Sequence, residues 1–312
     1  MPALYIDGQE GTTGLKIRER INGRTDIDLM VIDQDKRKDN AERKKLLNAA
    51  DIVILCLPDI ASREAVSLVE NPKVRIIDAS TAFRTDPSWA YGLPELSAGH
   101  LERIAKSPRV CVPGCHATGF IVSVYPLIQA GIITPDYPFI CTSITGYSGG
   151  GKKLIAKYES SPVNLLTRPY ALKLAHKHIP EMQKIPGLTH PPLFTPILGH
   201  FYNGMIVTVP LHTRLFKKNS DEKAVHECFS SYYKGRRFIK VMPLNDETSL
   251  DEGAMSAVEC NGTNRLELFV YGHKDQVLVI ARFDNLGKGA SMAAVQNMNI
   301  MLGLDEATGL AG

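Results

Sequence analysis

The feature that most constrains the fold is a glycine-rich turn directly after a strand-like run at the start of the chain. Leu4–Ile6 is typical of a strand, and the turn Gly8-Gln-Glu-Gly11-Thr12-Thr13-Gly14 then opens a helical stretch, Gly14–Arg20. Small residues let backbone N–H groups approach a pyrophosphate at the positive end of a helix. The spacing is GxxGxxG, not the more common GxGxxG, and an ordinary βα turn is the alternative. The position of the turn, directly after the first strand, favours dinucleotide binding by Gly8, Gly11, Thr12, Thr13 and Gly14.

The first 115 residues alternate short β runs with helical stretches. The further β runs are Ile27–Ile32, Ala49–Leu57, Val74–Asp78 and Arg109–Val112. Ala49–Leu57 is apolar except for Asp51, as in a parallel strand that is buried on both faces. Strands that alternate with helices form βαβ units. The sequence therefore predicts an α/β fold with a Rossmann-type, doubly wound parallel sheet.

After Cys115 the pattern changes, because regular helices no longer separate successive β runs. These runs are Phe139–Thr145, Met205–Leu211, Phe238–Val241, Arg265–Val270 and Gln276–Arg282. They predict an α+β second domain with a mostly antiparallel sheet. The alternation in Arg265–Val270 predicts a strand with one exposed face over its first half. Gly289–Leu302 is apolar at helical spacing and predicts a long closing helix.

Composition argues against nucleic acid or membrane as a partner. The formal net charge is only +3 and the basic runs are short. No apolar run approaches the roughly eighteen residues that a membrane span needs, and the N-terminus lacks the charged region and the small-residue cleavage site of a signal peptide. We therefore expect a cytoplasmic protein. Its six cysteines show no metal-type spacing and should be free thiols in a reducing compartment.

The end of the second strand is expected near the adenosine ribose of a bound dinucleotide. An acidic residue there favours NAD, whereas Arg or Lys accommodates the 2′-phosphate of NADP. The segment Asp33-Gln-Asp-Lys36-Arg37-Lys38 carries both signs. The residues alone leave the choice of cofactor open.

Cys115 lies in the most informative segment, Val112-Pro-Gly-Cys115-His116-Ala-Thr-Gly. A cysteine after a strand and a Pro-Gly break, just before a helix, would lie at a helix N-terminus. The helix dipole and the unpaired N–H groups lower a thiol pKa there, and the thiolate is the nucleophile. A small buried residue at a strand–helix junction is the alternative interpretation.

Two further clusters carry polar chemistry. Thr145-Gly-Tyr-Ser148-Gly149-Gly-Gly-Lys152-Lys153 is a plausible anion cradle, with a flexible loop as the alternative. His176 and His178 could supply acid–base chemistry near neutral pH. With no third ligand nearby, metal chelation by this pair is disfavoured, and we expect no metal site.

These motifs together resemble the shorter form of the N-acetyl-γ-glutamyl-phosphate reductase family, within the wider group that includes aspartate-semialdehyde dehydrogenase. The similarity runs in order over nearly the whole chain. Besides the glycine turn it comprises Asp78-Ala-Ser80-Thr-Ala-Phe-Arg84, Tyr91-Gly-Leu-Pro-Glu95, Val112-Pro-Gly-Cys115, Gly146-Tyr-Ser148-Gly149-Gly-Gly, His176-Lys-His178-Ile-Pro-Glu181, Phe194-Thr-Pro196 and Asp284-Asn285-Leu-Gly-Lys-Gly-Ala290. Eight such motifs in sequence are specific.

The resemblance implies roles for individual residues. Cys115 would be the nucleophile and His178 the assisting acid–base, with His176 the less favoured histidine. Ser80, Ser148, Gly149 and Asn285 would line the cofactor cleft, and Arg84, Ser148 and His176 would contact substrate. Lys152 or Lys153 is a further candidate for the anionic groups of the substrate, because ammonium pairs with carboxylate and phosphate. NADP would be the cofactor, and the protein would be a homodimer or homotetramer. Residues 1–115 and 286–312 would form the dinucleotide-binding domain, and 116–285 the catalytic and oligomerisation domain.

The implied reaction is NADPH-dependent conversion of N-acetyl-γ-glutamyl phosphate, a small acyl phosphate of arginine biosynthesis, into the semialdehyde through a Cys115 thioester. Rival readings are the same chemistry on aspartyl phosphate or an N-blocked aminoadipyl phosphate, or a non-catalytic NADP-binding sensor. Two departures from the longer members stand out. His116-Ala117 replaces the Tyr-Pro after the cysteine, and the histidine after Pro196 is missing, while His200 lies a few residues on.

Overall fold

The chain forms two compact units in a computed structural model that describes residues 1–160, 166–217 and 220–312. Met1–Pro113 and Ala290–Leu310 make up the first unit, and Gly114–Gly289 with Ala311–Gly312 the second. The expected domain boundaries lay at 115/116 and 285/286, a few residues from these divisions. The last helical segment of the chain thus packs within the N-terminal unit.

The first unit is built on a six-stranded, fully parallel sheet. In spatial order its strands are β2 (Asp28–Met30), β1 (Ala3–Asp7), β3 (Ile52–Leu55), β4 (Arg75–Asp78), β6 (Arg109–Cys111) and β5 (Ala90–Tyr91). The chain leaves β1 to one side for β2 and then crosses to the other side for β3. The carboxyl end of β1 is therefore the topological switch point, where open α/β sheets bind their ligands. The doubly wound parallel sheet is confirmed, and the two-residue strand β5 is an addition to the prediction.

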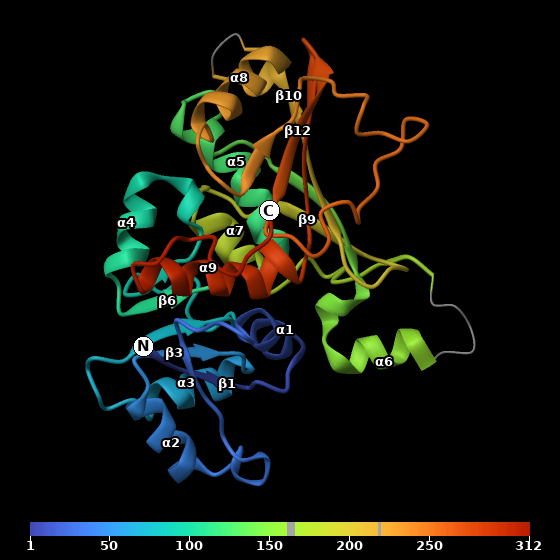
Figure 1. Cartoon of the computed structure of the whole chain (residues 1–312). Helices are drawn as coiled ribbons and strands as arrows, with labels where there is room; N and C mark the ends of the chain where they lie inside the picture. The colour runs from blue at the N-terminus through green and yellow to red at the C-terminus, as the bar shows by residue number, and fades with distance from the viewer. Residues whose placement is uncertain (161–165, 218–219) are drawn as a thin grey trace. The chain divides into compact units, whose positions relative to one another are not determined.

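The helices of this unit are α1 (Thr12–Ile21), α2 (Asn40–Ala49), α3 (Asp59–Ser67), α4 (Ala98–Lys106) and α9 (Met292–Met301). Figure 1 shows α9, at the red end of the chain, beside α4. Every residue of α9 is buried, and its apolar side chains join a core with Leu4, Ile6 and Ile54. Instead of the single helix expected over 289–302, a π-helical turn, Gly287–Ser291, runs into α9.

The Tyr91–Glu95 motif serves to dock α9. Asn297 on α9 donates to the carbonyl of Gly92 at 2.9 Å, and a Cβ on Gly92 would approach Asn297 Nδ2 to 2.7 Å. Gln296 donates to the buried Glu95 carboxylate at 2.9 Å. Only glycine fits so close to the helix, which explains part of this motif by packing.

The second unit contains a seven-stranded, mostly antiparallel sheet, as predicted. In spatial order its strands are β11 (Ile239–Val241), β12 (Leu266–His273), β13 (Gln276–Phe283), β10 (Met205–His212), β7 (Ile140–Gly146), β9 (Leu193–Gly199) and β8 (Arg168–Pro169). Its helices are α5 (Cys115–Gln129), α6 (Lys152–Ser160), α7 (Ile179–Lys184) and α8 (Glu222–Tyr232). A Cβ on Gly119 would collide with Val207 and Phe283, so this glycine lets α5 pack directly on β10 and β13.

Strand β9 was missing from the sequence prediction, although it is seven residues long and pairs in parallel with β7. Its sequence contains Pro196, which lies opposite Ser143. A proline lacks the N–H group that a ladder requires, and it therefore argues locally against a strand. Tertiary pairing along the rest of β9 outweighs that local signal.

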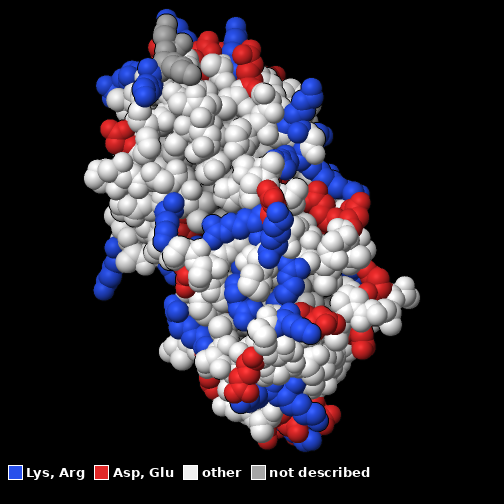
Figure 2. Space-filling view, turned by 90° about the vertical axis from the view of Figure 1, so that its left-hand side faces the viewer, with Lys and Arg blue, Asp and Glu red and all other residues white. Residues whose placement is uncertain are grey.

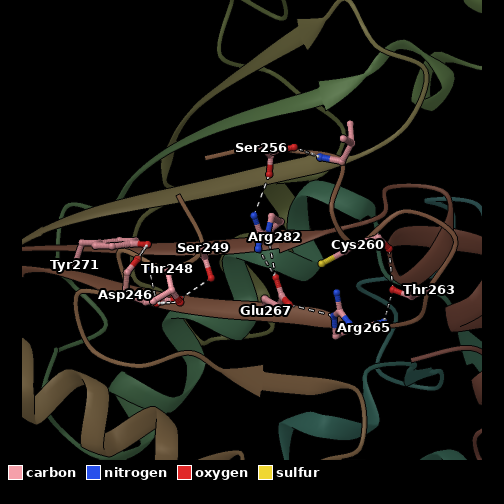
Figure 3. A network of polar contacts seen from close by, with 11 residues as sticks. Asp246, Thr248, Ser249, Ser256, Cys260, Thr263, Arg265, Glu267, Tyr271 and Arg282 are labelled. Atoms are coloured by element: carbon pink, nitrogen blue, oxygen red, sulfur yellow. Dashed lines mark hydrogen bonds and ion pairs between the residues drawn. The ribbon is translucent and has the colours of Figure 1, made fainter. Parts of the chain in front are cut away.

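The predicted exposed face at the start of β12 is wrong, because Glu267 is buried. Figure 3 shows this carboxylate next to Arg282 of β13. Arg282 donates to Glu267 Oε2 from Nη2 at 2.7 Å and from Nε at 3.0 Å. Its third contact is the Ser256 carbonyl, and it lies over the Phe269 ring. The alternation in Arg265–Val270 thus marks a buried ion pair and not a solvated face.

Charged side chains otherwise lie mainly on the surface. On the face in Figure 2, Lys and Arg are bordered and interrupted by Asp and Glu. Among the described residues, no helix is long and apolar enough to cross a membrane.

Candidate active site

The glycine turn lies at the switch point of the parallel sheet and opens α1. Gly8 has a positive φ of 87°, and a Cβ there would collide with the Cys56 carbonyl on the loop after β3. Gly11 N donates to the Gly8 carbonyl at 3.0 Å and closes the turn. A Cβ on Gly14 would likewise run into this turn. The three glycines thus give a tight turn that brings backbone close to the helix N-terminus, the arrangement that suits a pyrophosphate.

A cavity of about 530 Å³ opens beside this turn. Gly8 and Gly11 line it, whereas Thr12, Thr13 and Gly14 form the first turn of α1. At the far end it is lined by Ile32, Arg37 and Lys38, which follow β2, and by Arg43 of α2. Of the charged residues at positions 33–38 after β2, Arg37 and Lys38 line the cavity, together with the charged residues Asp7, Glu10, Arg43 and Glu64.

Arg43 was not recognised from the sequence. Its guanidinium donates to Asp7 Oδ2 at 2.9 Å from Nη2 and at 3.2 Å from Nε. Both side chains are buried. This ion pair, in which two N–H groups converge on one carboxylate oxygen, fixes the end of β1 to α2 and supplies one wall of the cavity. Its pairing depends on the sheet order, and no local signal in the sequence reveals it.

Ser80 and Arg84 lie in the same unit, after β4. Ser80 Oγ donates to Asp78 Oδ2 at 2.6 Å. Burial raises the pKa of Asp78, although the hydroxyls of Ser62 and Ser80 counteract it. Arg84 donates from Nε to the Val112 carbonyl at 2.9 Å and from Nη2 to the Ala79 carbonyl at 3.2 Å. Arg84 therefore holds the strand end that leads into the Pro113-Gly114-Cys115 turn.

Cys115 is the first residue of α5, with Gly114 as the N-cap. It is half-buried, so its sulfur lies at the end of the helix where backbone N–H groups and the dipole favour an anion. Gly289 lies directly behind it, since a Cβ there would come within 2.8 Å of Cys115 Cβ. This contact explains a glycine in the Asn285–Ala290 motif.

Glu181 fixes the turn before the cysteine. Its Oε2 accepts from Gly114 N at 3.1 Å, and the residue is 1% exposed. Glu181 belongs to α7, directly after His178. The carboxylate thus ties the N-terminus of α5 to the segment that carries the two histidines.

His176 and His178 lie next to each other at the start of α7, with ring centroids 4.7 Å apart and perpendicular planes. His178 is buried, and its backbone N–H donates to His176 Nδ1 at 3.1 Å. His176 Nδ1 is therefore an acceptor, which places the proton of the neutral ring on Nε2. His178 is the ring whose proton is not fixed by this bond.

A third imidazole, His116, completes the cluster. Its ring centroid lies 5.3 Å from that of His176 and 5.5 Å from that of His178. Its Nδ1 is bonded to Ser143 Oγ at 2.8 Å and its Nε2 to Tyr170 OH at 2.9 Å. Burial, with the charges of His176 and Lys177, lowers the pKa of His116 to about 3. His116 is thus a neutral ring at physiological pH.

Ser148, Gly149 and Asn285 are brought together in the second unit. Asn285 donates from Nδ2 to Ser148 Oγ at 3.1 Å and accepts at Oδ1 from Gly204 N at 2.8 Å. A Cβ on Gly149 would approach Asn285 Nδ2 to 3.3 Å. The 3-10 turn Tyr147–Gly150 therefore packs its small residues against this amide.

Lys152 and His200 are more peripheral. Lys152 begins α6 and is exposed, and His200 is exposed beside Tyr158, with ring centroids 6.0 Å apart. In the described parts of the chain, no group of three or more His, Cys, Asp or Glu could hold a metal ion. Sequence reasoning missed Ser143 and Tyr170, for which the chain gives no motif, and noted His116 only as a departure.

Comparison with known proteins agrees with this architecture. Residues 6–104 match the model of the semialdehyde dehydrogenase NAD binding domain, and residues 115–285 that of the semialdehyde dehydrogenase dimerisation domain. Solved structures with the same fold include aspartate semialdehyde dehydrogenases of Francisella tularensis (TM-score 0.73, 14% identity, 97% of this chain and 100% of that one) and Vibrio cholerae (TM-score 0.70, 16% identity, 97% and 98%).

Relatives of much higher identity carry one name. A protein of Nostoc sp. named N-acetyl-gamma-glutamyl-phosphate reductase 2 is 47% identical over 319 residues and covers 99% of both chains. The N-acetyl-gamma-glutamyl-phosphate reductase of Burkholderia ambifaria is 47% identical over 314 residues, 98% of both chains. With two domain models matched in order and near-complete overlap with these relatives, the chain belongs to the N-acetyl-γ-glutamyl-phosphate reductase family.

Proposed function

We propose that this protein reduces N-acetyl-γ-glutamyl phosphate to N-acetylglutamate semialdehyde and phosphate, with NADPH as the reductant and a thioester on Cys115 as the intermediate. The observation that carries the proposal is the position of Cys115 at the first residue of α5, whose N-terminus is tied by Glu181 to the segment with His176 and His178. A thiol there is activated by the helix N-terminus and by a neighbouring base. The names of relatives at 47% identity favour this acyl phosphate over aspartyl or N-blocked aminoadipyl phosphate.

The cavity beside the glycine turn fits the dinucleotide. Gly8 and Gly11 would hold the pyrophosphate against α1, and Arg37 with Lys38 would pair with the 2′-phosphate of NADP. Asp33, the residue that would favour NAD, is exposed and lies 3.7 Å from Lys36. When bound, the reduced nicotinamide supplies the hydride.

The first half-reaction is acyl transfer to the cysteine. The Cys115 sulfur forms a bond with the acyl carbon, and the carbon–oxygen bond to phosphate breaks, so that phosphate leaves with the electron pair. The N-terminus of α5 stabilises the thiolate before attack. Phosphate is a good leaving group, and the main tasks of the protein in this half are to activate the sulfur and to bind the anion.

The second half-reaction converts the thioester into an aldehyde. A hydride adds to the thioester carbon, and the resulting thiohemiacetal oxyanion collapses, which breaks the carbon–sulfur bond and regenerates the Cys115 thiolate. His178 stabilises or transiently protonates the oxygen, and a positioned acid–base group contributes roughly 10²–10⁴-fold. His176 accepts a backbone N–H at Nδ1, so the proton of its neutral ring lies on Nε2, the atom that would donate to substrate.

Substrate anions would be held by hydrogen-bond donors from several elements. Ser148, Gly149 and Asn285 form a compact polar group in the second unit. Arg84 is a further candidate for a carboxylate or phosphate, because guanidinium pairs with both. Lys152, exposed at the start of α6, would contribute mainly charge.

We further propose a cytoplasmic homodimer or homotetramer. The outer face of the second sheet carries apolar side chains that are exposed in one chain, among them Ile140 at 45% and Leu193 at 49%. Burial of such a face against another copy would remove them from water. All six cysteines are free thiols, as suits a reducing compartment.

A phosphate-dependent assay tests the proposal. With NADP and inorganic phosphate, N-acetylglutamate semialdehyde should be oxidised faster than aspartate semialdehyde or an N-blocked aminoadipate semialdehyde. Cys115→Ser keeps the shape but replaces the thiolate with a poorly ionised hydroxyl, so cofactor binding should persist while turnover nearly vanishes. Substantial turnover by that variant would exclude the mechanism.

A further inference from the structure

We infer that His116 is a positioning residue: a buried, neutral imidazole whose hydrogen bonds to Ser143 and Tyr170 fix the histidine-bearing segment against the nucleophile. The inference deepens the proposed function and rests on its roles for Cys115 and His178. It concerns the residue directly after the cysteine, where the chain departs from the Tyr-Pro of the longer family members.

The ring of His116 contacts several elements of the second unit at once. It lies in the first turn of α5 and is 2% exposed. Its two ring nitrogens are both occupied, one by Ser143 of β7 at 2.8 Å and the other by Tyr170, just after β8, at 2.9 Å. Its faces and edges contact His176, His178 and Phe194 of β9, with centroids 5.2–5.5 Å apart. One ring thus joins the helix start, strands β7 and β9, the residue after β8 and the segment before α7.

The electrostatics show why this ring holds position and does not transfer protons. Burial keeps His116 neutral, with a pKa lowered to about 3, far from the range of a useful acid–base group. A neutral imidazole has one donor and one acceptor nitrogen, and each is matched by a hydroxyl that can serve either role. The chain Ser143–His116–Tyr170 is therefore fully satisfied without a charge.

Tyr170 links this hydrogen-bonded series to the nucleophile. Burial raises its pKa, and the charge of the Cys115 thiolate raises it further. The phenol therefore stays protonated, and its hydroxyl is anchored by His116 Nε2 at 2.9 Å. Loss of either group would free the segment that carries His176 and His178 to shift relative to Cys115. A misplacement of about 1 Å can cost roughly 100-fold in rate.

The test measures iodoacetamide alkylation of Cys115 against pH, together with kcat and KM, in His116→Gln and Tyr170→Phe. If the hydrogen-bonded series Ser143–His116–Tyr170 positions His178, both variants lose about 100-fold in kcat with little change in KM for NADPH. The alkylation midpoint should also move up toward the free-thiol value of about 8.5. Because the two residues act as one unit, the double variant should be no slower than the slower single variant.

Tyr271→Phe is the matched control, because that phenol also loses one bond, to the Asp246 carbonyl at 2.7 Å, in the same unit. It should leave the midpoint and kcat unchanged. If His116→Gln does not fold, Tyr170→Phe carries the test alone. An unmoved midpoint with a lowered Tm, or losses that simply add in the double variant, would overturn the inference. The proposed function fails separately, through substantial turnover by Cys115→Ser.

Discussion

At the scale of single residues, burial separates the cysteines. Cys141 is fully buried and Cys260 likewise; burial raises the pKa of both thiols, that of Cys260 to about 11. They are protonated and inert at neutral pH. Cys115 instead begins a helix and is half-buried. The same residue type thus serves as packing in one environment and as the proposed nucleophile in another.

His116 should make stability depend on pH. Its pKa is lowered to about 3 in the folded chain, against about 6.5 unfolded. Between these two pKa values the unfolded chain binds a proton at His116 that the folded chain does not. The contribution of His116 to the free energy of unfolding is therefore complete above pH 6.5 and is lost as pH falls, at up to about 1.4 kcal/mol per pH unit.

Urea unfolding at pH 7 and pH 5 of wild type and His116→Gln measures this effect. His116→Gln should be less stable than wild type at pH 7, and the difference between their free energies of unfolding should be smaller at pH 5. His273→Gln, which alters an exposed ring, is the control and should show no such narrowing. A gap that stays constant or widens at pH 5 would show that His116 is not a buried neutral ring in the folded chain.

At the scale of elements, periodicity and turn chemistry predicted most of the architecture. Both sheets follow from the β runs, and Cys115 at a helix start follows from Pro113-Gly114. Strand β9 was missed because Pro196 masks a pairing that only its neighbours specify. Tyr170 and Arg43 were missed, and His116 was noted only as a departure from the longer family members, because the partners of all three come from distant elements. A contact set by tertiary packing leaves no periodic mark in the sequence.

The pair between β12 and β13 gives a prediction at this scale. Arg282→Met removes the buried cation of Glu267 and leaves only the partly exposed Arg265, whose Nε lies 3.2 Å from Oε1; breaking a buried pair costs about 3–5 kcal/mol. Adding Glu267→Gln removes the buried charge and should restore much of the loss. Urea unfolding of both single variants and the double variant measures the coupling. Purely additive losses would show that the two side chains do not act as a pair.

At the scale of the whole molecule, the two units carry different sets of the proposed functional residues. The first supplies a switch point with a glycine turn and a basic cavity end. The second supplies the cysteine, the histidines and the Ser148–Asn285 group. Family membership links these two sets of residues to one reaction, and the exposed sheet face of the second unit suits assembly of copies.

Cofactor preference tests the role of the first unit. In Arg37→Ala combined with Lys38→Ala, the KM for NADPH should rise on the order of tenfold to a hundredfold, because charge-assisted bonds to the 2′-phosphate are lost. The KM for NADH should stay nearly unchanged. Lys36→Ala is the matched control, since Lys36 does not line the cavity and faces Asp33. Equal changes for both cofactors would contradict the assignment.

The most direct test of the central claim is phosphate release in the absence of NADPH. If acyl transfer to Cys115 precedes reduction, rapid mixing with N-acetyl-γ-glutamyl phosphate should give a burst of one phosphate per active chain. Intact mass spectrometry should show one N-acetylglutamyl group on Cys115, and Cys115→Ser should show neither. No phosphate before NADPH is added, or an undiminished burst from Cys115→Ser, would contradict the thioester mechanism.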